Sequence, residues 1–385
     1  MKTSLLGACL LAPLTALAQG AGPATSSVQL YGRLDASVNS VRFSGVGATP
    51  SSQRSFLSSD TSRWGVRGTE DLGGGLQAFF KLESGFNVDT GMPSNAAQYF
   101  NRETLVGLRD KDYGSLTLGS QFTPNIAMSL RIDPFQRSGM GAMLTLFQRG
   151  GAAGILGYAP MHNNAVMYVS PSLNGFVGKA MYAMGEGAAV GHAGSYALEY
   201  SRDRLFLGMV HDRLRSTGAA AGQPALASVN NRVTSLGASY DFRAFKLYGY
   251  WVKADVDGSF GMRGGFVGVR VPAGRGEVNA VYQVRNVDDP ANSDARLFAV
   301  QYMHPLSKRT SIYTSVGHQS NKGNAAFGLW PSRTEANGSP PAGADVRGFQ
   351  VGMRHVFCVG SQARAAARQH ARAGPAHGHE GLGGG

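Results

Sequence analysis

Apolar and polar residues alternate along most of this chain with a period of two. From Val28 to Asn39, the even-numbered positions hold Val, Leu, Gly, Leu, Ala and Val, and the odd-numbered positions hold Gln, Tyr, Arg, Asp, Ser and Asn. This period places apolar side chains on one face of a β-strand and polar side chains on the other. About ten residues is also the length of a tilted strand that crosses a membrane. The pattern therefore predicts strands with one apolar face and one wet face, as in a membrane barrel.

Similar segments recur along the chain, and we count sixteen of them, an even number as bacterial membrane barrels require. The sequence therefore predicts an all-β fold, a sixteen-stranded antiparallel transmembrane β-barrel. The predicted strands lie near 28–38, 61–70, 76–87, 99–109, 114–122, 163–170, 175–184, 194–202, 205–214, 233–242, 245–254, 260–270, 274–285, 296–305, 310–318 and 346–357.

The connections between these segments alternate between short and long. Short turns rich in Gly, Pro, Asp or Asn on one end of a barrel, and longer polar loops on the other, are typical of outer-membrane barrels. Closure is also expected, because an open sheet edge in lipid would leave backbone groups unpaired. The long connections lie near 39–60, 88–98, 123–162, 185–193, 215–232, 286–295 and 319–345, and one at 255–259 is short.

The third long connection, 123–162, exceeds the ~12–15 residues beyond which an unstructured loop is usually functional. It is rich in Gly and Met and carries Arg131, Asp133, Arg137 and Arg149. We expect it to fold into the lumen, and a mobile external flap is the alternative.

The N-terminus predicts export. Residues 1–18 combine a positive start at Lys2, a short apolar stretch and an Ala16-Leu17-Ala18 cleavage pattern, as in a secretory signal peptide. The barrel should occupy residues 19–357. The only cysteines are Cys9 and Cys358, so no disulfide framework is expected, and the body holds no His/Cys cluster at metal-binding spacing. We predict no metal and no cofactor.

The formal net charge of +12 favours anionic partners. An exported protein rarely meets nucleic acid, so anionic solutes or lipopolysaccharide are the expected partners. The sequence has no G-x-S-x-G, H-E-x-x-H or P-loop motif, and we do not expect an enzyme.

Several long motifs resemble the Gram-negative general porins, most nearly those of β-proteobacteria. The resemblance runs from about 27 to 357. It is carried by VQLYGRLD at 28–35, SRWGVRGTEDLGGGL at 62–76, LESGF at 82–86, NR at 101–102 with LVGL at 105–108, YGSLTLGSQ at 113–121, NNAVMYVSP at 163–171, LSKRT at 306–310 and GMRHVF at 352–357.

The resemblance implies a homotrimer of barrels, each narrowed by its third loop, through which ions and small solutes diffuse. It places Arg33, Arg63 and Arg102 on a basic wall that faces acidic groups of the loop. The alternation of apolar and polar residues supports a lumen position for Arg33. The alternation is less clear for Arg102, because with Arg102 on the lumen face Glu103 would lie on the opposite face of the strand. Further lumen candidates are Tyr31, Asp35, Arg67, Lys81 and Glu83.

The sequence departs from this family in two respects at the pore. His162 stands where related porins often have Arg, and a neutral imidazole would remove one positive charge. The long loop also carries Asp133 as its one acid, against three arginines. A pore with basic residues on both sides should prefer anions. Arg131, Asp133 and Arg137 therefore join the expected constriction.

The C-terminus is the third departure. The resemblance places the terminal aromatic residue recognised by the barrel-assembly machinery at Phe357, yet residues 358–385 follow, rich in Ala, Arg, Gly and His. We interpret them as an atypical disordered tail and as a candidate frameshift product. Three functions stay open: a general diffusion porin with anion preference, a substrate-specific channel for phosphate or small carboxylates, and a non-transport outer-membrane barrel.

Overall fold

The computed structural model describes residues 26–148, 158–185, 191–217, 228–330 and 339–360. The predicted signal peptide and most of the predicted tail lie outside these residues. Within them, no helix is both long enough and apolar enough to span a membrane.

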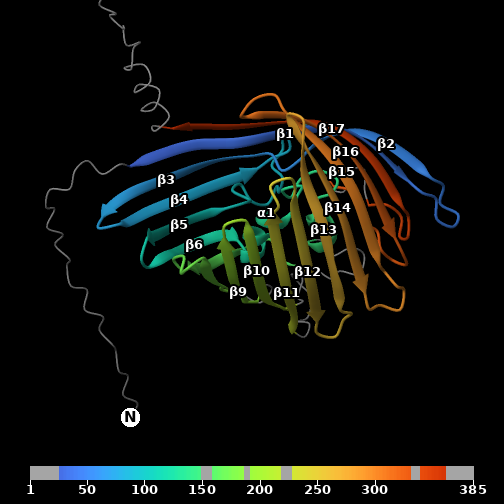
Figure 1. The fold of residues 1–385 in the computed structure, drawn as a ribbon. Helices are drawn as coiled ribbons and strands as arrows, with labels where there is room; N and C mark the ends of the chain where they lie inside the picture. Colours follow the sequence, from blue (N-terminus) through green and yellow to red (C-terminus); the bar gives the residue numbers. More distant parts are fainter. Residues whose placement is uncertain (1–25, 149–157, 186–190, 218–227, 331–338, 361–385) are drawn as a thin grey trace, which may run out of the picture.

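The described chain forms one antiparallel sheet that closes on itself (Figure 1). Each strand from β3 onwards pairs with the next, and β17 pairs with β1. The strands are β1 (Ser27–Phe43), β2 (Ser52–Ser59), β3 (Arg63–Gly73), β4 (Leu76–Gly85), β5 (Thr104–Asp110), β6 (Gly114–Phe122), β7 (Met161–Val169), β8 (Phe176–Ala183), β9 (Ala193–Arg202), β10 (Leu205–Thr217), β11 (Ser228–Asp241), β12 (Lys246–Val256), β13 (Met262–Ala273), β14 (Gly276–Val287), β15 (Ala295–Pro305), β16 (Thr310–Asn321) and β17 (Val346–Gly360).

The seventeen segments make sixteen barrel strands, because β2 and β3 are two halves of one strand. β2 pairs with the C-terminal half of β1, from Ala36 to Phe43, and β3 pairs with its N-terminal half, from Ser27 to Arg33. Between them Thr61 adopts a φ of 57°, which is uncommon for a β-branched residue. The prediction of a sixteen-stranded barrel is confirmed.

The expectation that 39–60 is a loop is wrong, because β1 extends to Phe43 and β2 occupies Ser52–Ser59. The sequence of β2, SQRSFLSS, has few apolar residues, so the alternation that identifies a lipid-facing strand is absent there.

Along each strand, successive side chains face alternately outward and inward. Outward positions include Val38, Trp251, Phe298 and Phe349, which are 42–61% exposed. Inward positions are mostly polar. They include Ser37, Asn39, Ser235, Gln283, Gln301 and Gln350, all of which are buried.

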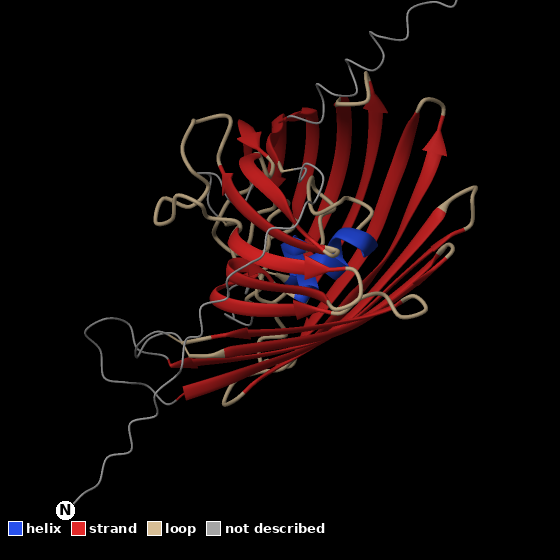
Figure 2. Ribbon diagram, turned by 90° about the vertical axis from the view of Figure 1, so that its left-hand side faces the viewer, coloured by secondary structure: helices blue, strands red, loops and turns tan. Residues whose placement is uncertain are grey.

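The third loop folds into the barrel, as predicted, with its helices α1 (Pro124–Ile132) and α2 (Leu144–Phe147) inside the ring of strands (Figure 2). Its apolar side chains, among them Met128, Ile132, Met143 and Phe147, form one core cluster with wall residues of β10 to β15. The loop therefore occupies one side of the lumen.

Glycines in the wall allow this close approach. A Cβ at Gly208 would lie 2.8 Å from Met128 Sδ, and one at Gly237 would lie 2.8 Å from Ile132 Cδ1. Real Cβ atoms do not approach other heavy atoms so closely. The two glycines thus leave room for the Met128 and Ile132 side chains against the wall.

Wall side chains also hold the loop by its backbone. Gln283 Nε2 donates to the Gly141 carbonyl at 2.7 Å, and Arg285 Nη1 donates to the Leu146 carbonyl at 2.7 Å. The Gly139 N–H donates to the carboxylate of Asp60, at the break between β2 and β3. These bonds fix the loop across the barrel.

The last strand continues three residues beyond Phe357, with Cys358, Val359 and Gly360 paired to Tyr31, Leu30 and Gln29. The strand therefore runs past the predicted end of the barrel. Phe357 lies opposite Gly32, and its ring occupies the space that a Cβ there would need.

Candidate ion-selective constriction

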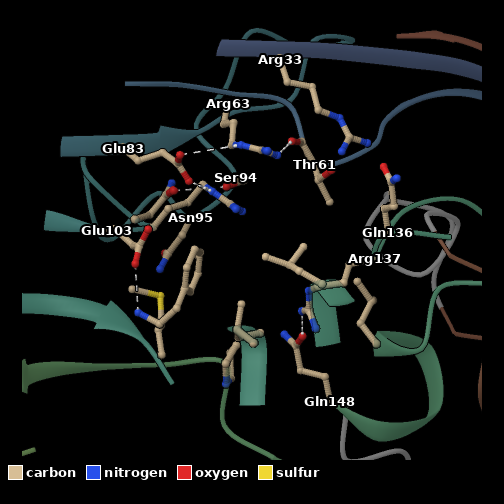
Figure 3. Close-up of a pocket in the computed structure, with 18 of the residues that line it drawn as sticks. Arg33, Thr61, Arg63, Glu83, Ser94, Asn95, Glu103, Gln136, Arg137 and Gln148 are labelled. Atoms are coloured by element: carbon tan, nitrogen blue, oxygen red, sulfur yellow. Dashed lines mark hydrogen bonds and ion pairs between the residues drawn. The ribbon is translucent and has the colours of Figure 1, made fainter. Parts of the chain in front are cut away.

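A cavity of about 420 Å³ lies between the third loop and the wall formed by β1, β3 and β4 (Figure 3). Five basic and two acidic side chains line it. The basic residues are Arg33, Arg63, Lys81, Arg102 and Arg137, and the acidic ones are Glu83 and Glu103. The structure thus brings together most of the residues that the sequence predicted for the wall.

Arg33 and Arg63 lie directly opposite each other on β1 and β3. Arg33 Nη2 donates to Asp35 Oδ2 at 2.7 Å, and Arg63 Nη1 donates to the Thr61 carbonyl at 3.3 Å. Asp35 is fully buried and also accepts from Arg354 Nε at 2.8 Å. Asp35 therefore orients Arg33 and Arg354, and its buried carboxylate offsets part of their positive charge.

The carboxylate of Glu83 interacts with the other cations of the wall. Its carboxylate accepts from Arg102 Nε and from the Tyr31 hydroxyl at 2.9 Å, and lies 3.7 Å from Arg63 Nε and 3.6 Å from Lys81 Nζ. Only 2% of the residue is exposed. One carboxylate thus positions three cations while leaving the wall net positive.

At Arg102 and Glu103 the structure differs from one of the predicted strands. The strand expected at 99–109 begins only at Thr104. The two residues before it pair irregularly with β4, where the Arg102 N–H donates to the Glu83 carbonyl at 3.2 Å and the Glu83 N–H to the Glu103 carbonyl at 2.7 Å. Because this segment is not a regular strand, both side chains reach the lumen, and Glu103 forms an ion pair with Lys81.

Arg137 supplies the positive charge on the loop side. Its guanidinium donates to Ser129 Oγ at 2.9 Å, to the Tyr158 hydroxyl at 2.6 Å and to Gln148 Oε1. All three acceptors are uncharged and belong to the loop. Arg137 therefore keeps its net charge beside the cavity, across from Arg63 and Glu83 (Figure 3).

Asp133 does not face the basic wall. It is 2% exposed, and it accepts hydrogen bonds from the backbone N–H groups of Phe135, Arg137 and Met143 at 2.9–3.1 Å. Burial raises the pKa of its carboxyl, and these donors oppose the shift. Asp133 therefore does not line the main cavity, and its role in ion selection stays a prediction.

Arg131 lies in a second, smaller cavity of about 230 Å³, with Asp133, Lys246 and Arg270. Its guanidinium stacks 4.1 Å above the Phe206 ring. Leu130 and Gln136 line both cavities. Arg137 and Arg131 therefore lie in two cavities that adjoin each other, and Arg149 lies outside the residues that the structure describes.

Six of the residues predicted for the lumen do not line the main cavity: Tyr31, Asp35, Arg67, Arg131, Asp133 and His162. His162, on β7, lines a neighbouring hollow with Asn95 and Asn101. Arg67 is exposed, donates to Gln29 Oε1 at 3.0 Å and lies 5.0 Å from the Tyr31 ring centroid.

Sequence reasoning missed several lining residues. Glu103 was assigned to the wrong face by extending the alternation past the start of its strand. Gln148 and Trp330 carry no pattern in the sequence that marks them. Trp330 Nε1 donates to Asp60 Oδ1 at 2.6 Å, so only the three-dimensional fold brings these residues together.

A closed barrel narrowed by its own loop and lined by charged side chains defines the porin class of channels. The Gram-negative porin family model matches residues 6–324. The chain is 32% identical over 374 residues to outer membrane porin protein 32 of Delftia acidovorans, covering 93% of this chain and 100% of that protein. It is 31% identical over 425 residues to an outer membrane porin of Bordetella pertussis, with the same coverage.

The solved structure of an anion-selective porin from Comamonas acidovorans is 30% identical, with a TM-score of 0.73, and the match covers 86% of this chain and 100% of that one. The chain belongs to the Gram-negative porin family and is a porin of the outer membrane. The resemblance found in its motifs is confirmed.

Proposed function

We propose that this porin is a passive diffusion channel for small hydrophilic solutes with a preference for anions. The cavity between wall and loop is lined by five basic side chains and two acidic ones. This excess of basic side chains is the main evidence for the proposal. A permeating anion meets net positive charge on both sides, whereas a cation is repelled. The anion selectivity named for the related Comamonas porin supports the same preference.

The channel would act without catalysis and without a cofactor. The charged residues of its wall are engaged in ion pairs that hold the arginines in place, and ions would pass between the wall and the loop. We further propose that Arg33, Arg63, Lys81, Arg102 and Arg137 set the selectivity, with Glu83 and Glu103 limiting it.

We also propose a homotrimer in a lipid environment that contains lipopolysaccharide. One structurally similar outer membrane protein of Vibrio cholerae, 16% identical, is described in a trimer form. We propose that Phe357 serves as the signal for the barrel-assembly machinery and that residues 1–18 are a cleaved signal peptide.

A channel specific for phosphate or small carboxylates is the second candidate, favoured by the clustering of five cations around one cavity of about 420 Å³. Single-channel conductance against salt and phosphate concentration separates the two functions. A linear increase supports general diffusion. A conductance that saturates with phosphate supports a binding site and overturns the general channel.

A further inference from the structure

The main cavity at the constriction is lined by an apolar surface as well as by cations. Side chains from the wall, from both loop helices and from the chain after β16 form this surface: Phe122, Ile126, Leu130, Leu144, Met161 and Trp330. An inorganic ion gains nothing from such a surface, whereas a solute with an apolar part is stabilised when that part leaves water. The lining is therefore suited to an organic anion.

Two pairs of these side chains are close neighbours. Phe122, at the end of β6, and Met161, at the start of β7, are cross-strand partners. Ile126 and Leu130 are four residues apart on α1 and so lie on the same side of the helix. The apolar surface is therefore built from paired side chains and is not a scatter of single ones.

Leu130 is the most exposed of the six, at 55%, although α1 lies inside the ring of strands (Figure 2). On the same helix Met128 and Ile132 are fully buried in the core cluster. The helix thus packs one apolar side against the barrel and presents Leu130 to the lumen. A solute that covers Leu130 removes apolar area from water.

Arginines lie beside this surface. Arg102 Cζ lies 5.0 Å from the centroid of the Phe122 ring, and Arg63 lines the same cavity. A guanidinium group binds a carboxylate through paired hydrogen bonds and also stacks on flat rings. Trp330 adds a second ring, whose orientation is restrained by the hydrogen bond from Nε1 to Asp60 Oδ1 at 2.6 Å. Cations and aromatic rings thus line one cavity.

We propose that the constriction binds small aromatic anions of the arylcarboxylate class. The acidic group would pair with Arg63 and Arg102, and the ring would cover Leu130 and the adjoining apolar surface. A volume of about 420 Å³ lies within the range of roughly 300–1,000 Å³ that is usual for small-molecule sites. Weak binding is compatible with passage, since a channel must release what it binds. The inference rests on the anion preference proposed above and names the class of organic anion that the constriction favours.

The test measures block of the single-channel chloride current of the full chain in planar bilayers at neutral pH. Three probes are compared: potassium benzoate carries a charge and a ring, potassium acetate carries the charge alone, and benzyl alcohol carries the ring alone. Benzoate should halve the current at a concentration about tenfold lower than acetate, because its ring adds buried apolar area. Benzyl alcohol should not block. Equal half-blocking concentrations of benzoate and acetate would overturn the proposal.

Two matched variants test the apolar surface. Leu130→Asn keeps the size of an exposed side chain and removes its apolar character, so the half-blocking concentration of benzoate should rise about three- to tenfold, with that of acetate unchanged. Leu173→Asn makes the same change at a side chain that is 65% exposed in the turn between β7 and β8, outside the main cavity, and should behave as the wild type. An unchanged benzoate block in the Leu130 variant, or an equal loss in both, would overturn the proposal.

Arg63→Gln localises the charged end. Leu130 lines both adjoining cavities, whereas Arg63 lines only the main one of the two, so this variant should weaken the block by benzoate and by acetate alike. An unchanged block would place the anions elsewhere and contradict the proposal. Circular dichroism and heat-modifiable gel mobility establish that all three variants fold.

The zero-current potential of the wild type in a gradient of potassium chloride separates the two levels of the account. A potential with the sign of chloride permeation, together with equal block by benzoate and acetate, would overturn the aromatic-anion site and leave the anion preference standing. A potential with the sign of potassium permeation would overturn the anion preference itself, and the site with it.

Discussion

Arg33 on β1 and Arg63 on β3 are directly opposed across two neighbouring strands, and both line the lumen cavity. Directly opposed like charges destabilise a sheet. Asp35, Thr61 and Glu83 accept hydrogen bonds or ion pairs from these arginines. The wall therefore maintains a concentration of positive charge that folding alone would not favour.

Replacing Arg63 tests the wall. A unit charge within about 6 Å of a passing ion contributes on the order of 1 kcal/mol in a wet lumen, so Arg63→Gln should lower the chloride-to-potassium permeability ratio roughly three- to tenfold. The ratio is obtained from zero-current potentials in planar bilayers. Arg275→Gln removes an equal charge from a turn outside the cavity and should leave the ratio unchanged. An equal effect of both would show that only net charge matters.

Replacing Glu83 should have the opposite effect on selectivity. Glu83→Gln removes the carboxylate shared by Arg63, Lys81 and Arg102, so anion preference should rise. Stability should fall by about 1–3 kcal/mol, because three cations lose a buried partner. Thermal unfolding and the zero-current potential measure the two effects. Glu277→Gln, whose partner Arg270 lies outside the main cavity, is the matched control. Weaker anion preference in the Glu83 variant would contradict this account.

The position of the third loop depends on the glycines beneath it. A side chain in Gly237→Leu would collide with Ile132 and Met128, at a cost of about 1–3 kcal/mol, and should push α1 into the lumen. Single-channel conductance should fall and current noise should rise. Gly249→Leu makes the same change where a Cβ meets no atom within 4 Å, and should conduct as the wild type. Identical conductance of the two variants would show that the glycine contact does not set the loop position.

Much of the fold could be predicted from the sequence because lipid imposes a period of two on every spanning strand. This period was not informative in two places. In β2 only Phe56 and Leu57 are apolar, and they are adjacent, so the segment shows no alternation. The residues before Thr104 leave the regular strand, so alternation placed Glu103 incorrectly. The buried position of Asp133 could not be predicted either. The sequence shows that the residue is acidic, but not that its carboxylate is buried and accepts hydrogen bonds from three backbone N–H groups. The glycine contacts under α1 join residues about 80–105 positions apart and carry no local pattern.

The residues after Phe357 offer a test of assembly. Phe357 packs over Gly32, and the strand pairs onward to Gly360. A chain ending at Phe357 should present the terminal aromatic residue and should yield more folded barrel in outer membranes than the full chain. Heat-modifiable gel mobility measures the folded fraction. A chain ending at Gly360 separates the effect of the three paired residues from that of the remaining tail. Equal yields from all three chains would show that the tail does not hinder assembly.

The central claim is that positive charge on both sides of the lumen cavity selects anions. The most direct measurement is the zero-current potential of the wild-type channel in a planar bilayer with a tenfold gradient of potassium chloride. The account predicts a potential with the sign of chloride permeation, reduced in size by Arg63→Gln. A potential with the sign of potassium permeation would contradict it.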